Sequence, residues 1–215
     1  DTQIKSFIKI IIFSVILLSL YMLFYTSNFS FINLRPIFFN VISILTGTGY
    51  VTGEFDVWGS FPLVFFLMLM FIGGCAGSTT CGIKIFRIQI LYVFVVNQLK
   101  KIIYPKGIFL IKYDKNTIDD KFMASIISFI FLYLVIFFLL TALLTLSGLD
   151  FVTSISGAAT SISNVGPGLG STIGPSGNFA NLPEFSKWIL SFGMILGRLE
   201  LFAILVLFLP SFWKD

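Results

Sequence analysis

The sequence lacks histidine altogether, and only 11% of its 215 residues are charged. Without histidine the chain has neither the usual proton shuttle of enzymes nor the commonest protein ligand of transition metals. A soluble domain averages about 25% charged residues, so the scarcity of charge argues against a soluble fold. Hydrophobic residues make up 57% of the chain, and the mean hydropathy is +0.99. The composition therefore indicates an integral membrane protein.

Cysteine is also scarce, with only Cys75 and Cys81, both inside an apolar, glycine-rich stretch. This setting is more typical of small packing residues than of a disulfide framework. The formal net charge of +4 gives no sign of nucleic-acid binding, because most of the basic residues lie in one loop. The sequence therefore predicts neither a disulfide framework nor a nucleic-acid partner.

Four apolar stretches are long enough, or nearly so, to cross a bilayer, which takes about 20 mostly apolar residues in a helix. They cover residues 7–25, 61–77, 128–146 and 188–210. Two shorter stretches, 36–46 and 151–163, are about half a span, and each ends at a glycine-rich loop before the next span. The order of span, half-helix, loop and span therefore occurs twice, which predicts an all-α membrane protein built from two tandem units.

The two units come into register when Gly49 is matched with Gly166. A hydroxyl residue then lies six positions before each glycine, Ser43 in one unit and Thr160 in the other. Few other residues are identical, so the repeat is one of architecture rather than of sequence.

The basic residues predict the orientation in the membrane. Eight of the fourteen lie between the second and third spans. They are Lys84, Arg87, Lys100, Lys101, Lys106, Lys112, Lys115 and Lys121. Cytoplasmic loops of membrane proteins carry an excess of lysine and arginine, so this segment is predicted to be cytoplasmic and the half-helices to enter from outside. We interpret 84–121 as a basic cytoplasmic linker between an N-terminal unit, 1–83, and a C-terminal unit, 122–215.

The loops after the half-helices read GTGYV and NVGPG. Irregular backbone at membrane depth is tolerated only where it is buried in protein or lines water. Glycine adopts backbone angles that let successive carbonyls point the same way, and rings of carbonyls can replace the hydration shell of K+. The sequence thus predicts a potassium-channel-like pore, with an external hairpin turn as the alternative. The predicted filter residues are Gly47, Thr48, Gly49, Tyr50, Val51, Asn164, Val165, Gly166, Pro167 and Gly168.

A run of small residues, which we call the glycine loop, interrupts the second apolar stretch. It consists of Gly73, Gly74, Cys75, Ala76, Gly77, Ser78, Thr79, Thr80, Cys81 and Gly82. Two interpretations stay open: Gly73 and Gly77 form a GxxxG pair for helix packing, or the helix is broken and the loop crosses the pore. A phosphate-binding loop is excluded, because Ile83 precedes Lys84 and the required GK[ST] is absent.

The sequence predicts no enzyme. The stretch GPSG at 174–177 has the form of a serine nucleophile motif. An intramembrane serine protease would pair this serine with a histidine, and the chain has none. We interpret the stretch as part of an external loop.

Arg198 lies near the middle of the fourth apolar stretch. A charged residue at the bilayer centre costs at least ~2.5–3.5 kcal/mol unless it is paired or in contact with water. Arg198 could therefore act as an electrostatic barrier beside the pore, or it could only tie helices together through backbone carbonyls. Glu200, two positions further on, does not face Arg198 on a helix and needs a different partner.

Four segments resemble the TrkH family of the Trk/Ktr/HKT superfamily of potassium transporters. They read SILTGTGYVTGEFDVWGSFP, FIGGCAGSTTCGIKIFR, NVGPGLG and KWILSFGMILGRLELFAILVLFLPSFWKD. The resemblance implies potassium uptake across the bacterial inner membrane, with K+ bound at the filter carbonyls of Thr48, Gly49, Val165 and Gly166. It also implies that the glycine loop gates permeation and that Arg198 lies near the ion path. At Cys81 the sequence departs from the glycine that is usual in the family.

The resemblance also implies partners. Family members have four such units around one pore, so the two units here match the third and fourth, and an N-terminal half with the first and second is expected. A second copy of the chain and a cytoplasmic nucleotide-binding regulatory subunit of the TrkA type are expected as well. K+ is the transported ion, and no covalently bound cofactor is expected. An ion-coupled secondary cation transporter and a non-transporting membrane scaffold stay open as alternatives.

Overall fold

The computed structural model describes residues 1–25, 34–114, 116–199 and 201–213. Within these ranges most residues are helical, as predicted. The one exception in regular structure is a short antiparallel hairpin, in which Lys112 pairs with Thr117 and Tyr113 with Asn116. Two residues of the sequence analysis, Lys115 and Glu200, lie outside the described residues.

The N-terminal unit contains a long helix, a half-helix and a second, shorter helix. Its elements are α1 (Thr2–Tyr25), α2 (Leu34–Leu45), the 3-10 turn η2 (Phe55–Trp58) and α3 (Ser60–Phe71). The predicted half-helix is therefore present as α2, which packs between α1 and α3.

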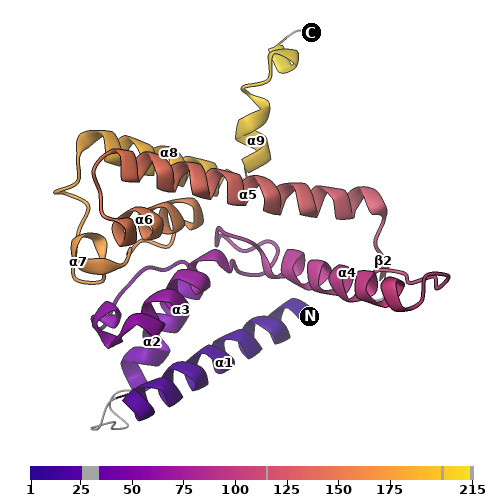
Figure 1. The fold of residues 1–215 in the computed structure, drawn as a ribbon, viewed down its shortest axis with the longest axis horizontal. Helices are drawn as coiled ribbons and strands as arrows, with labels where there is room; N and C mark the ends of the chain where they lie inside the picture. The colour runs from indigo at the N-terminus through magenta and orange to yellow at the C-terminus, as the bar shows by residue number, and fades with distance from the viewer. Residues whose placement is uncertain (26–33, 115, 200, 214–215) are drawn as a thin grey trace.

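The C-terminal unit repeats this order. Its elements are α5 (Asp120–Leu146), α6 (Phe151–Ser163), the single turn α7 (Gly170–Ile173), α8 (Glu184–Arg198), α9 (Leu201–Val206) and η3 (Pro210–Trp213). The half-helix α6 lies between α5 and α8, and it also contacts α3 of the N-terminal unit (Figure 1). Ten of its 13 residues are buried, so α6 forms the centre of the molecule.

Helices α1 and α5 run in the same direction, and each is followed by its half-helix at the same end of the molecule (Figure 1). Both are long and apolar enough to cross a membrane. Their outer faces expose large apolar side chains, including Phe13 (62% exposed) and Phe24 (84%) on α1 and Phe131 (68%) and Phe138 (64%) on α5. A surface of this kind is costly in water and suits contact with lipid chains.

Two of the four predicted spans end earlier than expected. The stretch 61–77 is helical only to Phe71, because Ile72 is extended and Gly73 bonds to Ile83 instead of continuing the helix. The stretch 188–210 is also not one helix, since α8 ends at Arg198 and only the short α9 follows. Near the end of α8 the Asn164 side chain donates a 3.0 Å hydrogen bond to the Met194 carbonyl. Side chains that insert into the backbone hydrogen-bond ladder are a common cause of helix breaks.

The segment 84–121 contains structure that the sequence analysis did not predict. Helix α4 (Ile85–Ile103) fills its first half, and the strands β1 (Lys112–Tyr113) and β2 (Asn116–Thr117) follow. Helix α4 packs against α1 and α5, so it ties the two units together. Basic residues at Lys100 and Lys101 occupy its last turn, where positive charge stabilises the helix dipole.

Two glycines of α8, Gly193 and Gly197, are spaced as a GxxxG pair and let that helix approach α6 closely. A Cβ at Gly193 would lie 2.7 Å from the Ser161 hydroxyl oxygen and 3.0 Å from Leu140 Cδ1. A Cβ at Gly197 would overlap the carbonyl oxygen of Ile162. Because this carbonyl belongs to the backbone of α6, it has little freedom to move away.

We therefore expect Gly197→Ala to destabilise the protein by about 1–3 kcal/mol, although alanine normally favours a helix over glycine. The measurement is thermal unfolding of the detergent-solubilised protein. Gly53→Ala is the matched control, because the nearest atom to a Cβ there is Pro36 Cβ at 3.7 Å. Equal melting temperatures for the two variants would show that the close contact of α8 with α6 does not need glycine.

Candidate functional site: a paired filter and the loop beneath it

The structure brings the two predicted filter segments, 47–51 and 164–168, side by side. Gly49 and Gly166 both have positive φ angles, +76° and +117°. A Cβ built on Gly166 would lie 3.4 Å from the Cα of Gly49, and a Cβ on Gly49 would overlap the carbonyl oxygen of Val165. The backbone conformation favours glycine at both positions, and at Gly49 the lack of space for a Cβ requires it as well.

In the C-terminal unit, hydrogen bonds to α6 fix the direction of the filter backbone. Asn164 ends the helix in the left-handed conformation, with φ 51° and ψ 43°. The Val165 N–H donates to the Thr160 carbonyl at 3.1 Å, and the Gly166 N–H donates to the Thr160 hydroxyl oxygen at 2.9 Å. In a trans peptide the N–H and the C=O point in opposite directions. The carbonyls of Asn164 and Val165 therefore point away from α6.

In the N-terminal unit, hydrogen bonds to the backbone of α2 fix the direction of the filter segment. The N–H groups of Thr48 and Gly49 both donate to the Ser43 carbonyl, at 2.9 and 3.4 Å. The carbonyls of Gly47 and Thr48 therefore point away from α2. The Ser43 hydroxyl is buried and has no hydrogen-bond partner among the described residues. The Thr48 hydroxyl is 2.7 Å from that of Thr46.

One buried polar residue in each unit binds the backbone just after the filter segment, and the sequence analysis predicted neither of the two. The Asn40 side chain accepts a 3.1 Å hydrogen bond from the Thr52 N–H, and the Ser156 hydroxyl accepts one of 3.0 Å from the Leu169 N–H. Both lie on the half-helices and are fully buried. A polar side chain such as Asn40 inside the apolar run PIFFNVISILT was the available signal.

The remaining predicted filter residues lie at the outer end of the paired segments. Tyr50 is 71% exposed, whereas Val51 packs against the hydrophobic core. Pro167 lies beside Gly49, with its Cδ 3.3 Å from a Cβ built there. The Gly168 N–H donates to the Ile173 carbonyl of α7 at 2.7 Å, which anchors the segment as it leaves the filter.

The half-helix α6 begins with an acidic cap. The Asp150 carboxylate accepts a 3.0 Å hydrogen bond from the Thr153 N–H, and hydrogen bonding by Thr153 lowers the pKa of Asp150 below its usual value. The anion is also favoured at a helix N-terminus. The C-terminal end of α6, with its partial negative charge, is directed toward the filter segment, where it favours a cation.

The glycine loop leaves α3 and returns to almost the same place. Its ends are joined by hydrogen bonds from Gly73 N–H to the Ile83 carbonyl and from Ile83 N–H to the Phe71 carbonyl, both 2.9 Å. Gly77 has a φ of +80° and no atom within 4 Å of a Cβ built on it. The Gly73–Gly77 pair is therefore part of a closed loop and not a contact between two packed helices.

The tip of the glycine loop lies against the inner end of the N-terminal filter segment. The Thr80 hydroxyl donates a 3.1 Å hydrogen bond to the Thr46 carbonyl, the residue before Gly47. The Thr80 methyl carbon is 3.4 Å from a Cβ built on Gly47. On the α1 side, the Ala76 N–H donates to the Gln3 side chain at 2.7 Å. The loop is thus held between α1 and the predicted filter segment 47–51.

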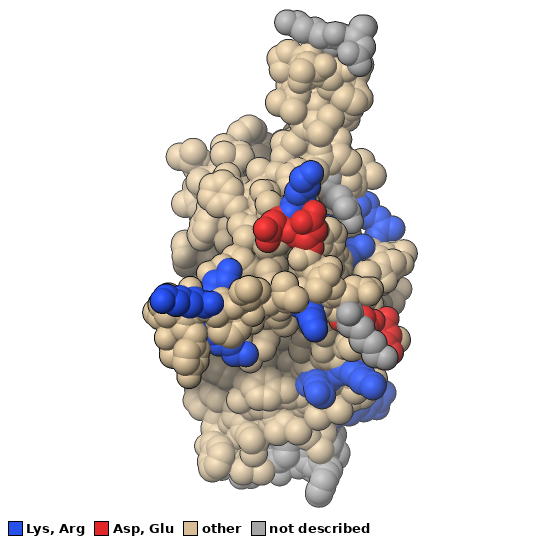
Figure 2. Space-filling model, turned by 90° about the vertical axis from the view of Figure 1, so that its right-hand side faces the viewer, with Lys and Arg blue, Asp and Glu red and all other residues tan. Residues whose placement is uncertain are grey.

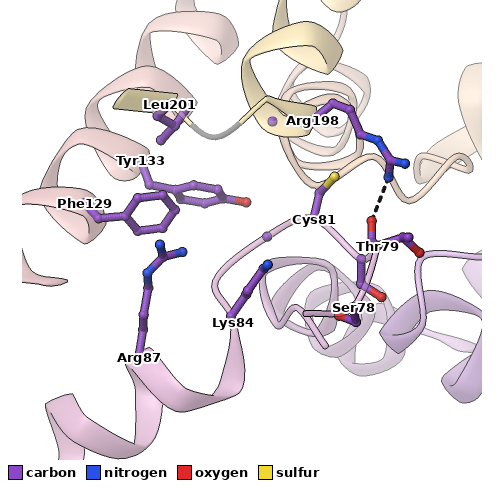
Figure 3. Close-up of a pocket in the computed structure, with 12 residues that line it drawn as sticks. Ser78, Thr79, Cys81, Lys84, Arg87, Phe129, Tyr133, Arg198 and Leu201 are labelled. Atoms are coloured by element: carbon purple, nitrogen blue, oxygen red, sulfur yellow. Dashed lines mark hydrogen bonds between the residues drawn. The ribbon is translucent and has the colours of Figure 1, made fainter. Parts of the chain in front are cut away.

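Arg198 reaches the same loop from the other unit. Its Nη1 donates a 2.7 Å hydrogen bond to the Thr79 carbonyl, which joins the end of α8 to the loop tip (Figure 3). Arg198 is exposed in this chain. A cavity of about 250 Å³ lies beside this contact, lined by loop residues 78–82 and by Phe129 and Tyr133 of α5. Arg87 also lines it, with its guanidinium 3.8 Å from the centre of the Phe129 ring.

Metal ligands of the usual side-chain type do not gather at this site. The described residues contain no group of three or more His, Cys, Asp or Glu side chains that could hold a metal ion. Cys75 and Cys81 are both free thiols in the glycine loop. The atoms that the site presents to a cation are backbone carbonyls, which suit weakly held alkali ions rather than transition metals.

Two tandem units, each with a half-helix that ends at a glycine-rich segment, define an all-α membrane protein of the pore-loop class. The TrkH family, described as a cation transport protein, matches residues 5–214. The chain belongs to this family, which confirms the family predicted from the sequence. Family and relatives are transport proteins, in agreement with the prediction that the chain is not an enzyme.

Individual relatives are similar along most of the chain. The Trk system potassium uptake protein TrkI of Halomonas elongata is 44% identical over 186 residues, which are 86% of this chain and 38% of that protein. TrkH of Escherichia coli K12 is 31% identical over 216 residues, covering 100% of this chain and 44% of that protein. The crystal structure of the potassium transporter TrkH from Vibrio parahaemolyticus superimposes with a TM-score of 0.91 at 31% identity, over 99% of this chain and 45% of that one. The chain thus spans about two fifths of the length of these relatives.

Proposed function

We propose that this chain supplies two of the units that surround a potassium-selective pore, and that K+ passes inward through this pore down its electrochemical gradient. The observation that carries the proposal is the direction of the filter backbone. In both units N–H groups bond back to the half-helix, so the carbonyls of Thr48 and Val165 point away from it. Carbonyls held in this way can replace the water around K+.

The filter in this proposal consists of residues 47–51 and 164–168, with K+ at the carbonyls of Thr48, Gly49, Val165 and Gly166. Backbone carbonyls are neutral dipoles, so they bind a weakly hydrated monovalent ion without trapping it. This balance between entry and release is what conduction requires. The partial negative charge at the C-terminal ends of α2 and α6 adds a favourable field for a cation.

The gate in this proposal is the glycine loop together with Arg198. The loop tip lies directly beneath the N-terminal filter segment through Thr80, and the Arg198 guanidinium holds it through the Thr79 carbonyl. A fixed positive charge beside the path would also repel a passing K+. Release of the Arg198 contact would let the loop move and would remove this barrier.

Two observations support the proposed partners: the relatives are more than twice as long as this chain, and its two filter segments do not form a closed ring. Two units provide only part of a ring of carbonyls, so two further units are needed to close the pore. We further propose the bacterial inner membrane as the location, with a second copy of the chain and a TrkA-type nucleotide-binding subunit as partners. The face with the C-terminal end of α4 and the hairpin carries many lysine and arginine side chains (Figure 2), which supports a cytoplasmic side there.

An ion-coupled secondary transporter is the main alternative. Transporters of that class often contain inverted repeats, whereas α1 and α5 here run in the same direction (Figure 1). They also usually use an ionisable residue for coupling. Among the described residues of the proposed filter and of the glycine loop, none is an aspartate, glutamate, lysine, arginine or histidine.

The proposal is tested by measuring ion flux into liposomes that contain the whole protein expressed from its natural gene. A pore gives K+ or Rb+ flux that follows the membrane voltage and needs no second ion gradient. Flux that depends on a proton or sodium gradient would indicate a coupled transporter, and absence of flux from folded protein would indicate a scaffold. Either of the last two results would overturn the proposal.

A further inference from the structure

The two units hold their filter segments in different ways, although Ser43 and Thr160 occupy the same register. Both residues lie six positions before the filter glycine, and both are 4% exposed. The Thr160 hydroxyl accepts the Gly166 N–H at 2.9 Å. The Ser43 hydroxyl has no partner among the described residues, and the Gly49 N–H instead makes a longer contact of 3.4 Å with the Ser43 carbonyl.

The Thr160 hydrogen bond acts on one particular carbonyl. The Gly166 N–H and the Val165 C=O belong to the same planar peptide unit, so fixing one fixes the other. With the N–H held against α6, the Val165 oxygen is turned toward the N-terminal filter segment. It is the atom that a Cβ on Gly49 would overlap. The hydroxyl thus orients a carbonyl that the proposed function assigns to K+.

Glycine makes this restraint necessary. The Val165–Gly166 peptide joins a glycine with φ +117° to the left-handed Asn164 turn, and a glycine peptide can rotate more freely than any other. The next residue is Pro167, which has no N–H to donate. Within the described part of the chain, the Thr160 hydroxyl is therefore the hydrogen-bond acceptor that fixes the plane of this peptide.

We infer that Thr160 is a positioning residue for ion selectivity: its hydroxyl holds the Val165 carbonyl in the direction that discriminates K+ from Na+, and the Ser43 hydroxyl has no equivalent role. The inference rests on the proposed function as a K+ pore. A smaller ion such as Na+ needs carbonyls that move inward, so a carbonyl with a fixed direction favours K+. Loss of the restraint should therefore affect selectivity more than total flux.

The test compares three variants of the gene product in liposomes by the ratio of K+ to Na+ flux. Thr160→Val keeps the shape and removes the acceptor, and we expect this ratio to fall about threefold to tenfold, as for one lost hydrogen bond. Thr160→Ser keeps the hydroxyl and should stay within about twofold of the parent. Ser43→Ala is the matched control at the same register and should also stay within about twofold.

The outcomes separate this inference from the proposed function. A parent protein without K+-selective flux would overturn both. A selective parent with an equally selective Thr160→Val variant would overturn the inference alone, as would an equal loss in Ser43→Ala. If Thr160→Val does not fold, Thr160→Ala takes its place in the same comparison. If neither variant folds, Thr160 is required for folding and the inference is wrong.

Discussion

Gly49→Ser should reduce the discrimination between K+ and Na+ at least about tenfold in liposome flux. Two costs combine at this position. A side chain at φ +76° is strained by roughly 1–2 kcal/mol, and the new Cβ would overlap the Val165 carbonyl oxygen. Because 1.4 kcal/mol corresponds to a factor of ten, displacement of this carbonyl needs to weaken the preference for K+ by only about 1.4 kcal/mol to give the expected loss.

Gly148→Ser is the control that separates the effect of backbone strain at positive φ from the effect of contact with the Val165 carbonyl. Gly148 has a similar φ of +90°, but no atom lies within 4 Å of a Cβ built on it. It lies between α5 and α6, away from the filter. We expect this variant to lose some stability and to keep its selectivity. If Gly49→Ser and Gly148→Ser discriminate equally well, Gly49 does not belong to a selectivity filter.

Arg198→Ala should raise K+ flux about tenfold while the protein stays folded. The substitution removes a hydrogen bond from a charged donor to the Thr79 carbonyl, and such bonds contribute about 1.5–3 kcal/mol. The population of the displaced loop, and with it the flux, should rise accordingly. Removal of the positive charge acts in the same direction. Arg198→Lys should give an intermediate flux, because lysine keeps the charge but lacks the planar fork of donors.

Lys187→Ala is the matched control on the same helix. Lys187 also lies on α8, but its ammonium group pairs at 2.8 Å with Glu184 of that helix. Its removal should leave the flux unchanged. Size-exclusion chromatography of each variant checks that the fold is intact. Unchanged or lower flux in folded Arg198→Ala protein would contradict the gating role and leave Arg198 as a tie between α8 and the glycine loop.

The elements that could be predicted from the sequence are those with a local signal. The half-helix at 151–163 was predicted with the bounds that α6 has, because the stretch is about half a span long and a glycine-rich loop follows its end. Gly73 and its small neighbours indicated that the helix of the second span could end early. Composition and glycine position carry this information without any knowledge of the tertiary structure.

The features that escaped prediction depend on contacts between distant residues. Helix α4 was not predicted, because arginine, glutamine and lysine interrupt its apolar residues and the segment resembled a basic loop. Near the end of α8, the Met194 carbonyl accepts a hydrogen bond from the side chain of Asn164, which lies 30 residues away. The different roles of Ser43 and Thr160 follow from rotamers and distances, which residue type and register do not determine.

The most direct test of the central claim is the position of bound ions in crystals of the gene product soaked with Rb+, located by anomalous scattering. We predict Rb+ between the two filter segments, coordinated by the carbonyl oxygens of Thr48 and Val165. Rb+ found only in the cavity beside Arg198 and the glycine loop, or held by carboxylates elsewhere, would contradict a carbonyl-lined filter at Gly49 and Gly166.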